Sequence, residues 1–151
     1  MRRWALLLLV SLGFLATTAP RAEAIVVMGQ AAVIDPETIE VGGQAIRLFG
    51  IAPPGRGTIC FNRHHQQANC WELSVESLAN LLDGRDWYCE GNRLDARGRL
   101  IGICRDGDLV INELLVARGW CRADRAHGNA YVQLELRAKR LRLGIWAMQQ
   151  Y

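Results

Sequence analysis

"TIEVGGQAIRLFGIAPPG", residues 38–55, combines a hairpin signal with a rigid corner. Two short runs rich in β-branched and other apolar residues flank Gly42-Gly43, a pair that favours a two-residue turn between antiparallel strands. The second run carries one basic residue, Arg47, and ends in Ala-Pro-Pro-Gly at residues 52–55. Strand ends often carry functional groups, yet this corner has no carboxylate, hydroxyl, imidazole or thiol. The stretch therefore predicts a β-hairpin that runs into a corner without reactive side chains.

The chain on either side of this hairpin predicts further strands and a helix. Upstream, "AIVVMGQAAVI" is rich in β-branched residues and precedes a "DPE" turn, so residues 25–49 predict a three-stranded meander. Residues 53–69 are polar and have no hydrophobic period, which indicates a loop. "SVESLANLLDG" then predicts an amphipathic helix with Ser74 as its N-cap, because apolar residues recur at helical spacing: Val75, Leu78, Ala79 and Leu82.

A second hairpin follows in "DWYCEGNRLDARGRLIGICRDGD", with its turn at residues 95–98. If the pairing is regular, Cys89 faces Cys104 across the ladder, close enough to form a disulfide. "VINELLVARGW" predicts a short helix that ends at Gly119. "YVQLELRAKRLRLGIW" predicts the last helix, whose apolar face consists of Tyr131, Leu134, Ala138, Leu141 and Ile145. Five strands with a helix after the third fit a small Greek-key barrel, so the expected fold class is α+β.

The first 24 residues have the three parts of a secretory signal peptide: a basic start, an apolar run over residues 4–15 and "AEA" as cleavage site. Because the run is shorter than the roughly 20 residues of a membrane span, we expect cleavage and no stable membrane insertion afterwards. One mature domain would then cover residues 25–151, exported to the periplasm or the medium. Without Arg2, Arg3, Arg21 and Glu23, 15 basic residues face 14 acidic ones, and a net charge of +1 is no general argument for nucleic-acid binding.

Five cysteines in an exported chain favour disulfides and leave one cysteine unpaired. Besides the pair across the second hairpin, Cys60 and Cys70 flank a single loop and form the second expected bridge, which leaves Cys121 free. His64 and His65 lie between Cys60 and Cys70, so the alternative is a zinc site with the pattern C-x₃-H-H-x₄-C. Its irregular spacing and the oxidising compartment favour the disulfide.

Five motifs, in order, resemble those of the staphylococcal-nuclease-like (thermonuclease) domain family. "VIDPETI" resembles the family's V-x-D-G-D-T-I, "IRLFGIAPPG" its R-L-x-x-I-D-x-P-E, and "LDARGRLIGIC" its D-x-Y-G-R-x-L. "INELLVARGW" resembles the helix N-x-x-L-V-x-x-G, and "LRLGIW" the terminal G-L-W or N-I-W. The resemblance spans nearly the whole mature chain and implies a five-stranded OB barrel with three helices. It also supports both disulfides, whose cysteines resemble the pattern of exported bacterial members.

Active members of this family are calcium-dependent phosphodiesterases that act on DNA and RNA. In them, two aspartates and a backbone carbonyl hold Ca²⁺, a glutamate is the general base, and two arginines clamp the phosphate. The metal and the arginines stabilise developing negative charge, while the carboxylate activates water.

The resemblance places the two phosphate-binding arginines at Arg47 and Arg99. Glu37 takes the place of the first calcium aspartate, and Asp35 matches the aspartate that precedes it. Ala52 takes the place of the second calcium aspartate, so the resemblance implies that this ligand is lost.

Further departures from the family pattern affect the base and the nucleotide contacts. Pro53 replaces a threonine, and Gly55 stands where the general base belongs. Arg97 replaces the tyrosine of Y-G-R, and Asp124 and Arg125 fall where nucleotide-contacting tyrosines are usual. The aromatic platform for a nucleobase is therefore missing at these positions.

Loss of a general base costs about 10²–10⁴ in rate, and loss of the metal removes further stabilisation. We therefore expect an exported, catalytically degenerate thermonuclease-like protein without a cofactor. Its Arg47 and Arg99, together with Arg97, would bind phosphate or another anionic ligand, nucleic acid included.

Three alternatives stay open. The arginines could serve only as partners of Glu37, Asp35 or Asp95. The protein could be a divergent nuclease that uses Ca²⁺ and takes Glu37 or Asp35 as a substitute base. It could also be a non-enzymatic envelope protein linked to exopolysaccharide production, for which the sequence indicates no particular partner protein.

Overall fold

The computed structural model describes residues 23–150, so the expected signal peptide over residues 1–24 lies almost entirely outside it. The predicted meander is confirmed. It consists of β1 (Ile25–Asp35), β2 (Thr38–Val41) and β3 (Gln44–Leu48), which pair antiparallel in chain order. Gly42 and Gly43 form the turn with φ values of 57° and 80°, a left-handed conformation that glycine adopts without a steric cost.

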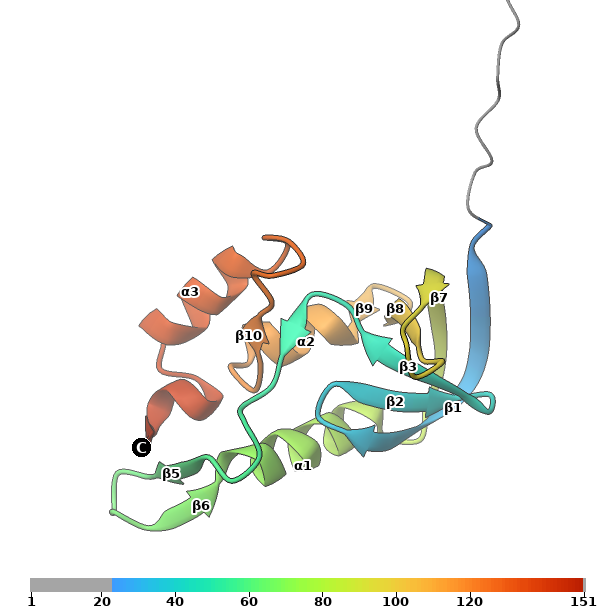
Figure 1. Ribbon diagram of the computed structural model, residues 1–151. Coiled ribbons are helices and arrows are strands. Elements are labelled where there is room, and N and C mark those ends of the chain that lie inside the picture. Colours follow the sequence, from blue (N-terminus) through green and yellow to red (C-terminus); the bar gives the residue numbers. More distant parts are fainter. Residues whose placement is uncertain (1–22, 151) are drawn as a thin grey trace, which may run out of the picture.

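The second hairpin joins the meander in one sheet. β7 (Asp86–Leu94) pairs with β1, and β8 (Leu100–Asp106) pairs with β7 and with β9 (Leu109–Val110). The strand order is β3-β2-β1-β7-β8-β9, and β3 also pairs in parallel with β8. The fold is α+β, with a mostly antiparallel sheet and three α-helices in the part of the chain that the structure describes (Figure 1).

The expected register of the second hairpin holds along most of its length and shifts by one residue before Leu94, near the turn. Cys89 and Cys104 are direct cross-strand partners with Cα atoms 4.1 Å apart, and the predicted disulfide joins them. Both side chains are buried, so this bridge crosslinks the hairpin inside the core.

The first helix, α1 (Cys70–Leu82), begins earlier than expected, and the prediction of Ser74 as its N-cap is wrong. Asn69 caps the helix, because its side-chain oxygen accepts the backbone N–H of Trp71 at 3.0 Å and that of Glu72 at 3.4 Å. Ser74 is buried one turn further on, where its hydroxyl lies 2.7 Å from the carbonyl oxygen of Trp120.

Residues 53–69, expected to be a loop, contain two short strands. β5 (Ile59–Phe61) pairs with β6 (Gln67–Asn69), and β5 also pairs with β11 (Gln149–Gln150). These pairings escaped prediction because the strands are only two or three residues long and one partner lies at the other end of the chain.

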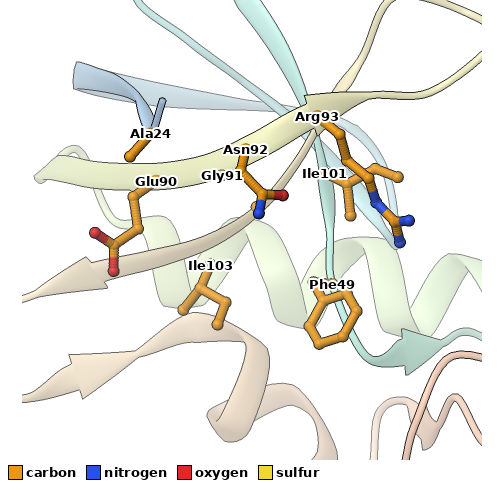
Figure 2. Close-up of a pocket in the computed structure, with 9 residues that line it drawn as sticks. Ala24, Phe49, Glu90, Gly91, Asn92, Arg93, Ile101 and Ile103 are labelled. Atoms are coloured by element: carbon orange, nitrogen blue, oxygen red, sulfur yellow. The ribbon is translucent and has the colours of Figure 1, made fainter. Parts of the chain in front are cut away.

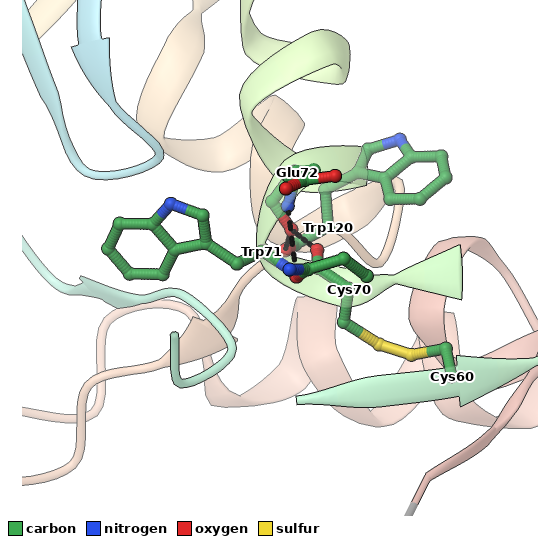
Figure 3. The surroundings of a disulfide bond; sticks show 7 residues. Cys60, Cys70, Trp71, Glu72 and Trp120 are labelled. Carbon is green, nitrogen blue, oxygen red and sulfur yellow. Dashed lines mark hydrogen bonds between the residues drawn. A yellow bond between two sulfur atoms is a disulfide. The ribbon is translucent and has the colours of Figure 1, made fainter. Parts of the chain in front are cut away.

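The predicted disulfide Cys60–Cys70 links β5 to the first residue of α1, with Cα atoms 5.6 Å apart (Figure 3). The zinc alternative is therefore wrong, because its two thiols are joined to each other. His64 and His65 are exposed.

The sequence predicts the bounds of the second helix better than those of the last one. α2 (Ile111–Ala117) lies where expected, but the last predicted helix is divided into α3 (Val132–Arg140) and a 3₁₀ turn, η1 (Gly144–Ala147). The division follows from Arg142, whose backbone is left-handed with φ of 52°. Leu141, predicted on the buried face, is 56% exposed because the helix ends before it.

The main core lies between the sheet, α1 and α2. Its fully buried side chains include Ile39, Ile46, Leu48, Leu78, Trp87, Leu100, Ile111 and Leu115. Cys121 is unpaired, as predicted, and its thiol is buried in the same core. No helix within residues 23–150 is both long enough and apolar enough to span a membrane.

Candidate functional site

Arg47 and Arg99 come together where β3 lies beside β8. Arg47 is in β3, directly opposite Thr38 of β2, and Arg99 immediately precedes β8. Both guanidinium groups approach the same oxygen of Glu37. Nε of Arg47 lies 3.5 Å from Oε1, and Nη1 of Arg99 lies 3.8 Å from it. The fold thus brings together three of the residues that the sequence placed at the site.

The turn of the second hairpin holds Arg99 in place. Its Nε donates to Oδ2 of Asp95 at 2.8 Å, and its Nη1 donates to Oγ1 of Thr38 at 2.8 Å. The other oxygen of Asp95 accepts the backbone N–H groups of Arg97 and Arg99, while the side chain of Arg97 is exposed. Desolvation raises the pKa of Asp95, but these hydrogen bonds outweigh it and hold the pKa below its usual value. Asp95 therefore stays ionised and keeps Arg99 in one orientation.

Arg47 is held more loosely than Arg99. Besides Glu37, it approaches Asp124, whose Oδ2 lies 4.0 Å from Nη2. Its Nε is buried and has no hydrogen-bond acceptor within the described part of the chain. The guanidinium group thus retains hydrogen-bonding capacity that the neighbouring residues do not use.

Asp124 reaches the site from the segment between β10 (Arg122–Ala123) and α3. Its backbone N–H donates to the carbonyl of Gly50 at 2.9 Å, and its Oδ2 lies 2.7 Å from Nδ1 of His127. Desolvation raises the pKa of Asp124, but hydrogen bonds from His127 and Ala126 and the charge of Arg47 hold it below its ordinary value. The sequence did not connect Asp124 and His127 with Arg47, because the contact depends on how distant segments pack.

Glu37 projects from the turn between β1 and β2. Its backbone N–H donates to Oδ1 of Asp35 at 2.9 Å, so Asp35 shapes the turn; among residues 23–150 it forms no ion pair with either arginine. The buried thiol of Cys121 lies 3.8 Å from the carbonyl oxygen of Pro36. Burial, and then the charge of Glu37, raise the pKa of Cys121, which therefore stays neutral and packs as a small apolar group.

The corner at residues 52–55 supplies no charged group. Ala52 ends β4 (Ile51–Ala52), which pairs with β10 (Arg122–Ala123), and Gly55 is exposed. No cluster of three or more metal-binding side chains occurs in the described range. Ca²⁺ takes roughly 6–8 oxygen ligands. The residues present do not fit such an ion, because Glu37 is engaged by two guanidinium groups and the corner offers a methyl group at Ala52.

Two arginines and three carboxylates therefore form one arginine–carboxylate cluster: Arg47, Arg99, Glu37, Asp95 and Asp124. Asp95 binds Arg99 at an ordinary charge-assisted distance, whereas the contacts of Glu37 are longer than such bonds usually are. The contact of Asp124 with Arg47 is the longest of the cluster at 4.0 Å, and Glu37 is the carboxylate that both arginines approach.

The chain matches no family model. It is similar to the succinoglycan biosynthesis protein ExoI of Rhizobium meliloti (strain 1021), with 30% identity over 126 residues. The aligned region covers 82% of this chain and 66% of that protein, just under two thirds of its length.

Proposed function

We propose that this protein is a non-hydrolytic relative of the staphylococcal-nuclease-like domains whose Arg47 and Arg99 bind a single anionic group, such as a phosphate or a carboxylate. The observation that carries the proposal is the approach of both guanidinium groups to one oxygen of Glu37, at 3.5 and 3.8 Å. Two arginines present several fixed donors that match the oxygens of one such anion. Glu37 marks the position that the anion would take.

The strand pairings support a barrel of the OB type. Each of the five long strands pairs with two others of the set, in the cyclic order β1, β2, β3, β8, β7. The helix α1 comes after the third strand, and the short strands β5 and β6 lie between the two. This is the connectivity expected of a five-stranded Greek-key barrel.

The corner after β4 supports the loss of hydrolysis. Ala52 and Gly55 stand where the resemblance places a calcium ligand and the general base. The missing base alone costs about 10²–10⁴ in rate. Glu37 is a poor substitute, because the guanidinium groups of Arg47 and Arg99 both approach one oxygen of its carboxylate and occupy the side that would face a water molecule.

The two disulfides support export. Both bridges are buried, and such bonds persist mainly in secreted and periplasmic proteins. An exported location agrees with the signal peptide that the sequence predicts over residues 1–24.

The similarity to ExoI favours a second function that is compatible with the first: a non-enzymatic part in exopolysaccharide production. The arginine–carboxylate cluster would then hold an acidic group of a glycan or of its precursor. A strain that carries Arg47→Ala and Arg99→Ala in the chromosomal copy tests this function. We expect its secreted polysaccharide to fall or change in acidic content, whereas an unaltered polysaccharide would contradict the function.

Anion binding is tested by titrating the exported protein with inorganic phosphate and following backbone amide shifts by NMR. We expect Arg47→Ala with Arg99→Ala to abolish binding. Glu37→Gln should strengthen binding about tenfold, because it removes the competing charge. Arg85→Ala is the matched control, since this exposed arginine pairs with Asp106 at the opposite end of the β7–β8 hairpin. Phosphate binding that survives the double substitution would overturn the proposal.

Hydrolysis is tested on single-stranded DNA and RNA with Ca²⁺, with Mn²⁺ or with EDTA. We expect no turnover by the natural sequence, and turnover by a variant with Ala52→Asp, Pro53→Thr and Gly55→Glu. Metal-dependent turnover by the natural sequence that Arg99→Ala abolishes would instead establish a divergent nuclease.

A further inference from the structure

A shallow groove of about 500 Å³ lies over β7 and β8, beside the arginine–carboxylate cluster. Figure 2 shows the side chains of Glu90, Asn92 and Arg93 from β7 and of Ile103 from β8 projecting to the same side as the ring of Phe49. The groove therefore gathers side chains from β7, from β8 and from the turn after β3, and Ala24 also lines it.

The floor of the groove is apolar and fixed. The side chains of Phe49, Ile101 and Ile103 are half-buried. The N–H of Phe49 donates to the carbonyl of Gly102 at 2.9 Å, and its carbonyl accepts Nδ2 of the buried Asn112 at 3.0 Å. An aromatic ring held beside two aliphatic side chains forms a preorganised platform for the apolar face of a ring-shaped ligand.

The rim of the groove is polar and nearly balanced in charge. Asn92 and Arg93 are exposed, so one amide and one guanidinium group face the solvent at the edge. Glu90 lies at the other edge and is ion-paired with Arg105. The rim thus offers both hydrogen-bond donors and acceptors, as a ligand with many hydroxyl groups requires.

The groove is continuous with the arginine–carboxylate cluster. A narrow crevice lined by Arg47, Asp124 and His127 shares three residues with the groove, namely Phe49, Arg93 and Ile101. A ligand bound in the groove therefore lies next to the residues that wall Arg47.

We propose that the groove binds a saccharide chain that carries isolated acidic groups. One sugar ring packs on Phe49, Ile101 and Ile103, and its hydroxyls bond to the rim. A carboxylate or a similar substituent on a neighbouring sugar replaces Glu37 between Arg47 and Arg99. The second part rests on the proposed anion-binding function, whereas the first part adds the class of ligand and does not need it.

Charge favours such a glycan over nucleic acid. A nucleic acid carries a phosphate at every residue, and its binding depends on several basic contacts along the strand. Here the rim contributes Glu90, and Asp95 and Asp124 remain beside the arginines after Glu37 is displaced. In a glycan with sparse negative charge, neutral sugars can lie beside these carboxylates, and only its acidic group contacts Arg47 and Arg99.

The test uses exported protein purified from cells that express the full chain. Four probes are titrated: a gellan-derived oligosaccharide with isolated uronates, a neutral β-glucan oligosaccharide and single-stranded DNA of matched length, and inorganic phosphate. The variants are Phe49→Leu, Arg93→Ala and Arg47→Ala, with Arg85→Ala as control. Thermal unfolding of each variant establishes that it is folded.

We expect the acidic oligosaccharide to bind at least about tenfold more tightly than the neutral one or the DNA. Phe49→Leu should weaken it several-fold and leave phosphate binding unchanged, and Arg93→Ala should also weaken it several-fold. Arg47→Ala should remove the preference for acidic over neutral sugar.

Three outcomes would overturn the inference. If phosphate binds but no oligosaccharide does, the inference fails and the proposed anion site stands. If the oligosaccharide binds regardless of Phe49→Leu and Arg93→Ala, the groove is not the site. If DNA binds more tightly than the acidic oligosaccharide and depends on Phe49, the ligand is nucleic acid. If phosphate does not bind but sugar binding still depends on Phe49, the proposed anion site is wrong and the groove stands.

Discussion

Glu135, in the first turn of α3, places a carboxylate in the interior with only 1% of its side chain exposed. Its Oε2 lies 2.6 Å from Nη1 of Arg125, and its Oε1 lies 2.7 Å from Nζ of Lys139. Nζ of Lys139 also lies 4.4 Å from the centre of the Trp146 ring. Desolvation raises the pKa of Glu135, but Lys139 and Arg125 outweigh it and hold the pKa below its usual value. The carboxylate therefore connects α3 with the segment that positions Asp124.

Glu135→Gln should destabilise the protein by about 1–2 kcal/mol at neutral pH, because it removes the charge that binds Arg125 and Lys139, two cations that solvent partly screens. Since the pKa of Glu135 is lower in the folded state, its stabilisation is fully present above the unfolded value near 4.5 and is lost as pH falls through the folded pKa. Urea unfolding at a series of pH values should therefore show the two proteins converging in acid. Glu76→Gln, at an exposed position of α1, is the control. A difference that stays constant with pH would show that the charge of Glu135 is not responsible.

At the scale of elements, α1 shows how a boundary depends on one side chain. Asn69 satisfies two of the backbone N–H groups that a helix leaves unpaired at its start, and the disulfide to Cys60 holds the next residue. Figure 3 shows the bridge at the end of the helix, next to Trp71 and Glu72, whose backbone N–H groups donate to the cap. The cap and the disulfide therefore both fix the segment 53–69 to the start of the helix.

Asn69→Ala should lower the free energy of unfolding by about 1 kcal/mol, because it removes the cap, whereas Asn69→Asp should retain most of it. Thermal or urea unfolding measures the difference. Asn80→Ala, at an exposed position inside the same helix, is the matched control. Equal effects of the two alanine substitutions would contradict a capping role.

Elements defined by neighbouring residues could be predicted from the sequence, and those defined by distant partners could not. Alternating β-branched residues and Gly42-Gly43 predicted the meander, and hairpin symmetry predicted the Cys89–Cys104 bridge. Ser74 was mistaken for a cap because its real partner, Trp120, lies far along the chain.

The same distinction applies to the arginine–carboxylate cluster. Arg47, Arg99 and Glu37 were found through motifs, but the motifs did not show that one oxygen of Glu37 serves both arginines. Asp124, with His127 as its partner, reaches the cluster through the β4–β10 pairing, for which the two-residue strands carry no local signal.

At the scale of the whole molecule, residues 23–150 form two cores of unequal size. The main core carries the sheet, the Cys89–Cys104 bridge and the strands that hold the arginine–carboxylate cluster. The smaller core consists of the Cys60–Cys70 bridge and Ile145, with Trp120, Trp146 and Met148 packed against it. β11 reaches this smaller core by pairing with β5, so the C-terminal segment depends on it.

Because the small core contains few apolar side chains besides its disulfide, we expect it to open separately once the disulfide is lost. Cys60→Ala with Cys70→Ala should lower the free energy of unfolding by about 2–4 kcal/mol. In hydrogen exchange, amides of β5, β6 and residues 144–150 should lose protection first, while those of β1 and β7 stay protected. Phosphate binding at Arg47 and Arg99 should persist, because the cluster belongs to the main core.

The matched comparison is Cys89→Ala with Cys104→Ala, which removes the bridge inside the main core. This pair should lower protection across β1, β7 and β8 together and weaken phosphate binding at the same time. If both pairs of substitutions reduced protection uniformly over the sheet, the two cores would unfold as one unit. Separate opening would instead mean that the C-terminal segment and the residue 59–69 hairpin are stabilised by the Cys60–Cys70 bridge, independently of the anion site.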